Sequence, residues 1–172
     1  IKGKCDNNIN RTRNDNFPVS TDNKFELKMK GVCIANLNVH HLLPKLEEIK
    51  LYLGQSVKPH IIGFCETFLQ NDIDDERLNI QNYIFERKDR TNKQGGGLIV
   101  YLCENISYTR RYDLECNNIE SIWVQINQSR KRRFLLNFVY RPPSSNQAWI
   151  ELYESQIELA DKLNIDFYPV TV

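Results

Sequence analysis

The chain has 172 residues and a mass of 20.3 kDa, which is the length of about one domain. It contains 23 Lys and Arg against 22 Asp and Glu, so its net charge is +1, and 41% of its residues are hydrophobic. This balance excludes a protein that holds nucleic acid by bulk positive charge, and it is typical of globular chains. The longest apolar run, Leu98–Cys103, is far shorter than the roughly 20 residues of a membrane-spanning helix, so we expect no membrane partner.

The first 30 residues differ in composition from the rest of the chain. They carry seven Lys and Arg against four Asp and Glu, whereas residues 31–172 carry 16 against 18. Because the segment is polar and Asn-rich, without hydrophobic periodicity, we predict a mobile polar leader ahead of one domain over 31–172. It lacks the apolar core of a secretion signal, and the five cysteines form no Cys-x-x-Cys pair. An intracellular protein, nuclear or cytoplasmic and with reduced thiols, is therefore expected.

A β-α-β unit is predicted to open the domain. The apolar run Val32–Ala35 indicates a buried strand, and apolar residues at steps of three and four over Leu42–Leu53 indicate a helix. Pro44 suits the first turn of that helix, and Gly54 can end it. A second buried strand is predicted over His60–Glu66. This order predicts two parallel strands joined by a right-handed crossover.

The middle of the chain predicts consecutive antiparallel strands followed by one helix. Turn-rich stretches separate the apolar or alternating segments. Strands are predicted over Asn82–Arg87, Gly97–Leu102, Ile106–Arg111, Ser121–Ile126 and Arg133–Tyr140, a helix over Trp149–Leu163, and the start of another strand over Ile165–Val170. The predicted fold class is α/β, a mixed sheet with flanking helices.

Three polar residues, Asn38, Glu66 and Tyr140, are predicted at the carboxyl ends of apolar strands. Ligand sites in α/β sheets gather outside such ends. A carboxylate there suits Mg²⁺, which takes oxygen ligands; an amide can orient a phosphate oxygen, and a phenol can donate to developing negative charge. On position alone, structural explanations are favoured over ligand roles: a solvated strand end for Glu66, a turn before the helix for Asn38 and a half-buried sheet aromatic for Tyr140.

Glycine and arginine patterns suggest further contacts. The run Gly95–Gly97 favours a hairpin turn that feeds the next strand, with a phosphate cradle as the alternative. Arg90 favours a structural ion pair over a substrate contact. The basic pairs and clusters suit either soluble loops or a DNA backbone. The candidate DNA contacts are Arg90, Arg110, Arg111, Arg130, Lys131, Arg132, Arg133 and Arg141.

Taken together, these segments resemble the endonuclease/exonuclease/phosphatase superfamily, and within it the endonuclease domains of non-LTR retrotransposons. The order and spacing of the motifs extend over about residues 31–163. The motifs are Leu37–Leu42 with Pro44 and Lys45, Ile61–Leu69, Tyr83 with Arg87–Arg90, Gly95–Leu98, Glu120–Val124 and Phe138–Pro143.

The resemblance implies a two-layer α/β sandwich that cleaves phosphodiester bonds with Mg²⁺, or with Mn²⁺ as the alternative. It implies that Glu66 binds the metal, that Asn38 helps to orient the metal and the scissile phosphate, and that Tyr140 hydrogen-bonds the phosphate. The implied substrate is DNA, nicked to prime reverse transcription, and a reverse transcriptase domain is the implied partner in a longer polyprotein.

The resemblance also has limits along the chain. The family continues with a Gly-Asp-Phe-Asn strand end and a Ser-Asp-His motif, whereas this chain ends soon after Asp166-Phe167, to which no catalytic role is carried over. From this we expect an incomplete sandwich whose first sheet lacks a covering sheet, and a fragment that is inactive alone. The alternatives are a non-catalytic nucleic-acid-binding remnant and a phosphatase of the same fold acting on a small phosphate ester.

Overall fold

The computed structural model describes residues 31–56, 58–90, 95–129 and 132–171. The predicted leader, Arg130, Lys131 and the side chain of Arg132 lie outside the described residues. None of the described helices has the length and apolar character needed to cross a membrane.

The first half of the domain forms a four-stranded sheet in the order β1-β2-β4-β3. Its strands are β1 (Ile34–Asn38), β2 (Ile61–Cys65), β3 (Tyr83–Lys88) and β4 (Leu98–Cys103). The β1–β2 pair is parallel and the other two pairs are antiparallel, so the predicted β-α-β opening is confirmed. All five residues of β2 are buried, because both faces of this central strand are covered.

The second half forms another four-stranded sheet in the order β5-β6-β7-β8. Its strands are β5 (Tyr108–Arg110), β6 (Glu120–Ser129), β7 (Arg132–Tyr140) and β8 (Phe167–Thr171). The β6–β7 hairpin is antiparallel, and β8 pairs in parallel with β7. The helix α3 (Gln147–Asp161) makes this crossover, and the Asn146 side chain caps it by accepting a hydrogen bond from the Trp149 N–H.

Short helices complete the described chain. The 3₁₀ turn η1 (Leu43–Lys45) carries Pro44 in its first positions and leads into α1 (Leu46–Leu53), as the sequence predicts. The helix α2 (Asp75–Leu78) and the 3₁₀ turn η2 (Tyr112–Leu114) were not predicted. The helix α2 has only four residues, too few for hydrophobic periodicity to reveal it, and its local signal is the capping side chain of Asp74.

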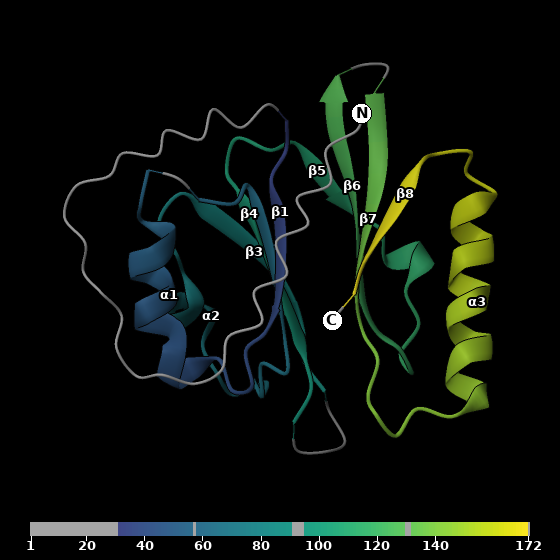
Figure 1. The fold of residues 1–172 in the computed structure, drawn as a ribbon, viewed down its shortest axis with the longest axis horizontal. Helices are drawn as coiled ribbons and strands as arrows, with labels where there is room; N and C mark the ends of the chain where they lie inside the picture. Colours follow the sequence, from purple (N-terminus) through teal and green to yellow (C-terminus); the bar gives the residue numbers. More distant parts are fainter. Residues whose placement is uncertain (1–30, 57, 91–94, 130–131, 172) are drawn as a thin grey trace, which may run out of the picture.

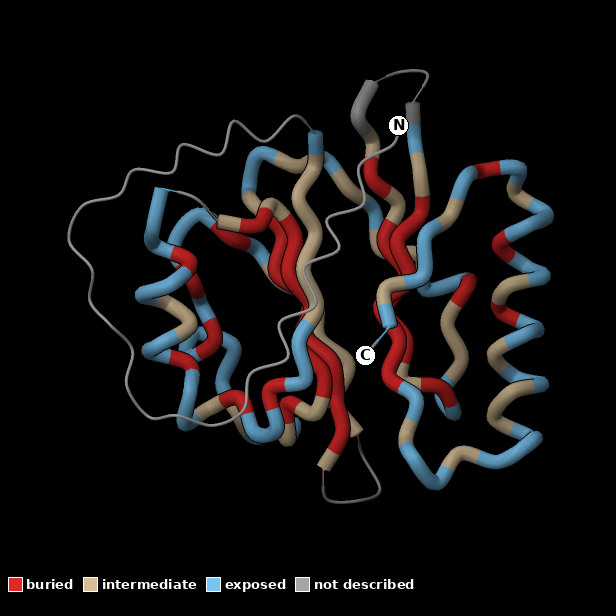
Figure 2. The backbone as a smooth tube through the Cα atoms, in the orientation of Figure 1, coloured by how far each residue is buried: buried red, intermediate tan, exposed pale blue. Residues whose placement is uncertain are grey.

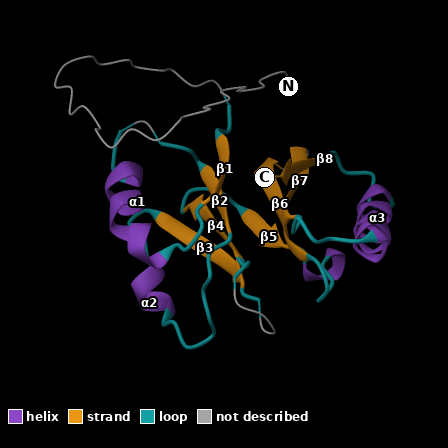
Figure 3. Cartoon of the chain, turned by 60° about the horizontal axis from the view of Figure 1, so that its bottom comes forward, coloured by secondary structure: helices purple, strands orange, loops and turns teal. Residues whose placement is uncertain are grey.

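The elements stack in four layers, with α1 and α2 outside one sheet and α3 outside the other (Figures 1 and 3). Buried strands of the two sheets face each other across the centre (Figure 2). Three hydrophobic clusters fill the spaces between the layers. Leu42, Leu53 and Tyr101 belong to the cluster between α1 and the first sheet. Ile61, Val100 and Phe138 belong to the cluster between the sheets, and Trp123, Leu135 and Ala160 to the cluster between the second sheet and α3.

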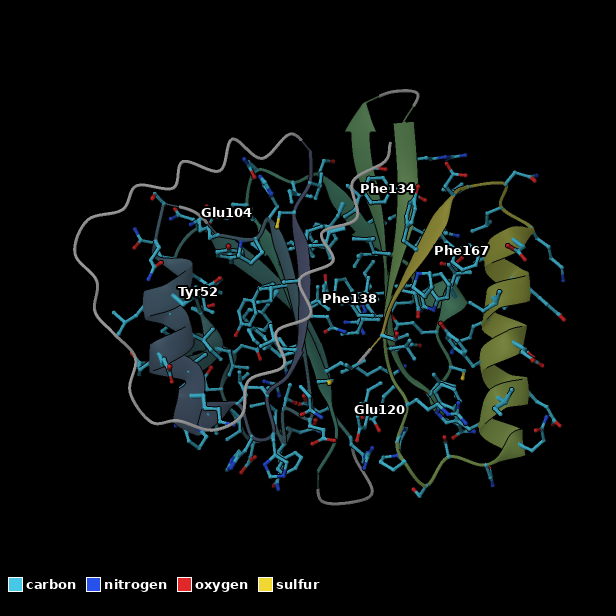
Figure 4. All side chains as sticks on the ribbon, in the orientation of Figure 1. Tyr52, Glu104, Glu120, Phe134, Phe138 and Phe167 are labelled. Carbon is cyan, nitrogen blue, oxygen red and sulfur yellow. The ribbon has the colours of Figure 1, made fainter. Side chains whose placement is uncertain are left out.

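The fold class is confirmed as α/β, but the expectation of a first sheet without a covering sheet is wrong. The strands β6 and β7 place alternate side chains, among them Ile122, Val124 and Phe138, against β2 and β4. Figure 4 shows Phe138 between the two sheets. The described residues therefore contain both sheets of the sandwich and the apolar layer between them.

Candidate active site

The structure brings Glu66 and Tyr140 together at one end of the sandwich. Glu66 directly follows β2 in the first sheet, and Tyr140 is the last residue of β7 in the second. The Tyr140 hydroxyl donates a hydrogen bond to Oε1 of Glu66. The contact joins residues 74 positions apart, so two strand ends that the sequence analysis singled out meet across the sheets.

Backbone hydrogen bonds hold Glu66 from both sides. On the β1 side, the Val39 N–H donates to the Cys65 carbonyl at 3.0 Å and the His41 N–H to the Glu66 carbonyl at 2.8 Å. On the β4 side, the Phe68 N–H donates to the Gly96 carbonyl at 2.9 Å. Glu66 adopts a φ of 53°, a left-handed conformation that is uncommon for residues other than glycine. Such strain persists where the surroundings impose it, and it gathers at functional sites.

Burial keeps the groups beside Glu66 neutral. Burial and the neighbouring Glu66 carboxylate raise the pKa of Tyr140 above its usual value, so its hydroxyl remains a donor. Burial, then the charge of Glu66, raises the pKa of Cys65 to about 11, so this thiol also stays protonated at neutral pH. The Glu66 side chain therefore lies beside a protonated thiol and a protonated phenol, and the phenol orients one of its oxygens.

Asn38 is exposed at the end of β1, and its Oδ1 accepts a hydrogen bond from the His40 N–H at 3.0 Å. This hydrogen bond belongs to a local turn, which is the structural explanation for Asn38 and the alternative to a ligand role. Asn38 pairs in register with Cys65, so it lies beside the strand end that carries Glu66. Its predicted role in metal and phosphate binding stays a prediction.

A second asparagine, Asn36, was not singled out by the sequence analysis. Ile34 on β1 packs between the sheets and Ala35 packs on the helix side, so alternation places Asn36 and Asn38 on the face between the sheets. Asn36 donates from Nδ2 to the Val170 carbonyl at 3.1 Å, while its buried Oδ1 has no hydrogen-bond partner. The two-residue spacing of the asparagines is the sequence signal that could have revealed it.

The Gly95–Gly97 segment is built against the loop that follows Glu66. All three glycines have positive φ, and a Cβ on Gly97 would lie 2.6 Å from Oγ1 of Thr67. The carboxylate of Glu120 accepts from the Gly97 N–H at 2.6 Å and from Arg90 Nε at 2.7 Å. Glu120 lies at the same end of the sandwich as the glycine segment (Figure 4). The segment thus feeds β4 as predicted, and Arg90 has a structural ion pair.

We expect Glu120→Ala to lower the free energy of unfolding by about 2 kcal/mol, because it removes charge-assisted hydrogen bonds to Arg90 and to the Gly97 N–H. Urea denaturation followed by circular dichroism measures the change. The matched control is Glu47→Ala, since Glu47 is 83% exposed and its pair with Lys50 adds at most about 1 kcal/mol. Equal losses in the two variants would contradict a bracing role for Glu120.

The Arg110 and Arg111 guanidinium groups are engaged with protein acceptors. Arg110 is 9% exposed; it bonds to both carboxylate oxygens of Glu115 at 3.0 and 3.1 Å and to Glu86 at 3.0 Å. Arg111 bonds to both carboxylate oxygens of Asp113 at 2.8 and 2.6 Å and holds the pKa of Asp113 below its usual range. These contacts give both arginines a role in the fold, and their predicted contact with DNA stays a prediction.

Two further predicted DNA contacts, Arg133 and Arg141, are exposed. Arg133 lies near the start of β7, away from the strand ends that carry Tyr140 and Glu66. Arg141 directly follows Tyr140, bonds to Oγ of Ser145 at 2.8 Å and lies 5.7 Å from the Trp149 ring centre. Arg141 is thus the exposed guanidinium next to the site end of β7.

Asp166 precedes β8 and lies at the opposite end of the second sheet from Tyr140. The parallel register pairs Leu135 with Phe167 and Val139 with Thr171, and the Leu135 N–H donates to the Asp166 carbonyl at 2.8 Å. Tyr140 follows Val139 at the far end of the same pair of strands. Asp166 therefore lies at the other end of the strands from Tyr140, and so away from Glu66.

The sequence matches no protein-family model. A search of curated proteins also finds no match. Solved structures do match its fold. The AP endonuclease LMAP from Leishmania major aligns with a TM-score of 0.63 and 15% identity, over 81% of this chain and 54% of that protein. The 3′ phosphatase NExo from Neisseria, bound to a product DNA hairpin, aligns with a TM-score of 0.57 and 12% identity, over 82% and 57%.

The endonuclease domain of TRAS1, a telomere-specific non-LTR retrotransposon, aligns with a TM-score of 0.53 and 18% identity, over 81% of this chain and 57% of that domain. The chain thus spans a little more than half the length of the solved structures that it matches. Over the shared part, this chain has the fold of the endonuclease/exonuclease/phosphatase proteins.

Proposed function

We propose that this chain supplies the Glu66 side of a metal-dependent phosphodiesterase site that acts on DNA. The observation that supports the proposal most directly is the Glu66–Tyr140 hydrogen bond, which holds the side chain of a residue with a strained backbone where a strand end of each sheet meets. The fold likeness to nucleic-acid phosphoesterases and the order of motifs along residues 31–163 support the same chemistry. A DNA-nicking activity of the retrotransposon type is the finer form of this proposal.

The donor set at this end fits Mg²⁺. Within the described ranges, no three His, Cys, Asp or Glu side chains gather into a metal-binding group. Mg²⁺ is often held by only one or two carboxylates, with waters and substrate phosphates completing its shell. Glu66 offers the carboxylate, and the buried Oδ1 of Asn36 is an amide oxygen without a partner on the face between the sheets. Mn²⁺ takes the same kinds of ligand.

When bound, the metal ion would stabilise charge on the scissile phosphate and on the leaving oxygen. The side chains of this chain perform the positioning. The Glu66 carboxylate would hold the cation, and the Tyr140 hydroxyl donates its single proton either to that carboxylate, as in this structure, or to a phosphate oxygen of the substrate. Asn36 and Asn38 lie on the same face of β1, and the exposed amide of Asn38 is the one that orients a phosphate or a water. The exposed guanidinium of Arg141 lies where it can neutralise a neighbouring phosphate.

The proposal is tested by Mn²⁺ titration of the 172-residue chain, followed by electron paramagnetic resonance, with Mg²⁺ as competitor. We expect Glu66→Gln to weaken Mn²⁺ binding at least about tenfold, since the variant keeps the shape of the side chain but loses the charged ligand. The matched control Glu48→Gln alters an exposed carboxylate on α1 and should leave binding unchanged. Equal affinities in Glu66→Gln and wild type would overturn the proposed metal site.

Nicking of supercoiled plasmid with Mg²⁺ is measured on the same variants. From the sequence we expect no nicking by this chain alone. Nicking that Glu66→Gln abolishes would overturn that expectation and support the proposed chemistry directly. Nicking that persists in Glu66→Gln would contradict the role of Glu66.

A further inference from the structure

Beside Glu66, three rings meet on two loops and do not belong to any of the three hydrophobic clusters. The Phe68 ring centre lies 5.1 Å from that of His40 and 5.8 Å from that of His41, and the His41 and Phe68 planes are close to parallel, at 27°. His40 and His41 are exposed, and Phe68 is half-buried and is not a member of the hydrophobic clusters described for this chain. These rings therefore contribute little to the packing of the core, and another role has to explain them.

The backbone at these rings is strained. His40, His41 and Phe68 have φ angles of 39°, 79° and 55°. Positive φ is a marked outlier for a bulky aromatic residue such as Phe68. The Phe68 N–H donates to the Gly96 carbonyl at 2.9 Å, and the His41 N–H donates to the Glu66 carbonyl at 2.8 Å. The fold thus holds these rings in place at a cost in backbone energy, as functional loops commonly do.

A pocket of about 310 Å³ opens beside these rings, lined by His41, Phe68, Gln70 and Gly95. A Cβ on Gly95 would lie 3.2 Å from Cε1 of Phe68, so the glycine lets the phenyl ring lie against the backbone. The volume is at the lower end of the roughly 300–1,000 Å³ typical of small-ligand sites. It suits one flat group better than an extended chain.

We propose that this pocket binds an unpaired nucleobase of the substrate, next to the phosphodiester that Glu66 addresses. Since the Phe68 and His41 rings already stack on each other, a base stacks on the outer side of this ring pair, and the Gln70 amide supplies hydrogen bonds to its edge. Aromatic stacking of this kind accepts any base and requires the base to have left the duplex stack. The inference rests on the proposed function, since it names the substrate class of the same site: DNA with an unpaired base, rather than a phosphate ester without one.

The pocket's position relative to Glu66 follows from chain connectivity. Phe68 is two residues after Glu66, and His41 bonds to the backbone of Glu66 itself. A nucleic acid whose phosphate lies at Glu66 therefore has its adjacent bases within reach of the rings. Contact with a base at this point would set which DNA structures the site accepts.

The test uses the 172-residue chain and single-stranded deoxyoligonucleotides that carry one 2-aminopurine at successive positions, with EDTA present. At one position we expect quenching of the 2-aminopurine fluorescence, because the base stacks on a ring. Phe68→Leu should remove the quenching and weaken binding about 5- to 150-fold, the effect of losing one stacked base. Phe68→Tyr keeps the ring and should behave as wild type. Tyr168→Leu, which removes a half-exposed ring on β8, should have no effect.

A second oligonucleotide carries an abasic residue at the quenched position, so it has no base to stack there. It distinguishes a loss of base stacking from a general distortion of the loop by the substitution. The Phe68→Leu loss should vanish on this probe. An equal loss on both probes, or no quenching at any position, would overturn the base pocket. Unchanged binding by Phe68→Leu, with Mn²⁺ binding at Glu66 intact, would overturn the pocket and leave the proposed function standing. Quenching that depends on Phe68 in a chain without Mn²⁺ binding would overturn the proposed function and leave the pocket standing.

Discussion

Replacing Arg110 with alanine is expected to lower the free energy of unfolding by about 3 kcal/mol, because two carboxylates lose the guanidinium and keep weaker partners, Lys88 at 3.4 Å for Glu115 and the Tyr108 hydroxyl for Glu86. Glu115 is 7% exposed, and Glu86 reaches the same guanidinium from the first sheet. Burial lowers the pKa of Arg110, but the hydrogen bonds that Arg110 donates to Glu115 and Glu86 outweigh it, raise the pKa and keep the group charged. The ion cluster thus closes one side of the sandwich by joining β3 to β5, and removing its centre uncouples the sheets there.

Urea denaturation of Arg110→Ala measures this loss. Arg133→Ala serves as the control, since Arg133 is exposed and its replacement should change stability by less than about 0.5 kcal/mol. A predicted DNA contact would behave differently. If Arg110 binds a phosphate, Arg110→Ala should reduce the salt dependence of DNA binding by about one counterion and leave stability nearly unchanged.

Substituting alanine for Gly63 should cost about 3 kcal/mol of stability by forcing the two sheets apart. A Cβ at this position would lie 2.4 Å from Cδ1 of Phe138 and 2.8 Å from Oδ1 of Asn36. Both neighbours are held, since Phe138 is fully buried and Asn36 is bonded to β8. Overpacking a filled core typically costs about 1–3 kcal/mol, and a contact this short belongs at the upper end.

Thermal and urea unfolding of Gly63→Ala test this. Adding Phe138→Leu should recover part of the loss, because the smaller side chain makes room for the methyl group. Gly54→Ala is the control: Gly54 follows α1 with a φ of −75°, and the change should stay below about 1 kcal/mol. A loss that Phe138→Leu does not reduce would place the strain elsewhere than between the sheets.

The strands and the two long helices follow from sequence because their signals are local. The run Ile61–Cys65 is apolar throughout, and the strand is buried on both faces. The spacing of Ile150, Tyr153, Ile157 and Ala160 predicts the helix that the structure shows as α3. Such patterns depend on neighbours within one or two turns of chain. Whether the second sheet covers the first depends on the pairing of strands far apart in sequence, and that expectation failed.

The residues of the candidate site divide along the same line. Glu66 and Tyr140 were found because each stands at the end of an apolar run. Their hydrogen bond arises only because the two sheets pack face to face, and so does the buried Oδ1 of Asn36 that lacks a partner. The sequence pattern does not predict how the sheets pack. For Arg110, adjacency to Arg111 suggested a basic patch. Its partner Glu86 lies 24 residues earlier in the chain, so an ion cluster within the fold was not visible.

The left-handed residues around the site have an evolutionary consequence. His40, His41, Glu66 and Phe68 each hold a conformation that glycine or asparagine adopts more readily, and such strain costs of the order of 1–3 kcal/mol per residue. A gene copy released from selection on its chemistry would gain stability by drifting to those smaller residues. Selection for stability alone would therefore not retain Glu66 and Phe68. Related sequences that still carry both residues are expected to be under selection for the function of the site.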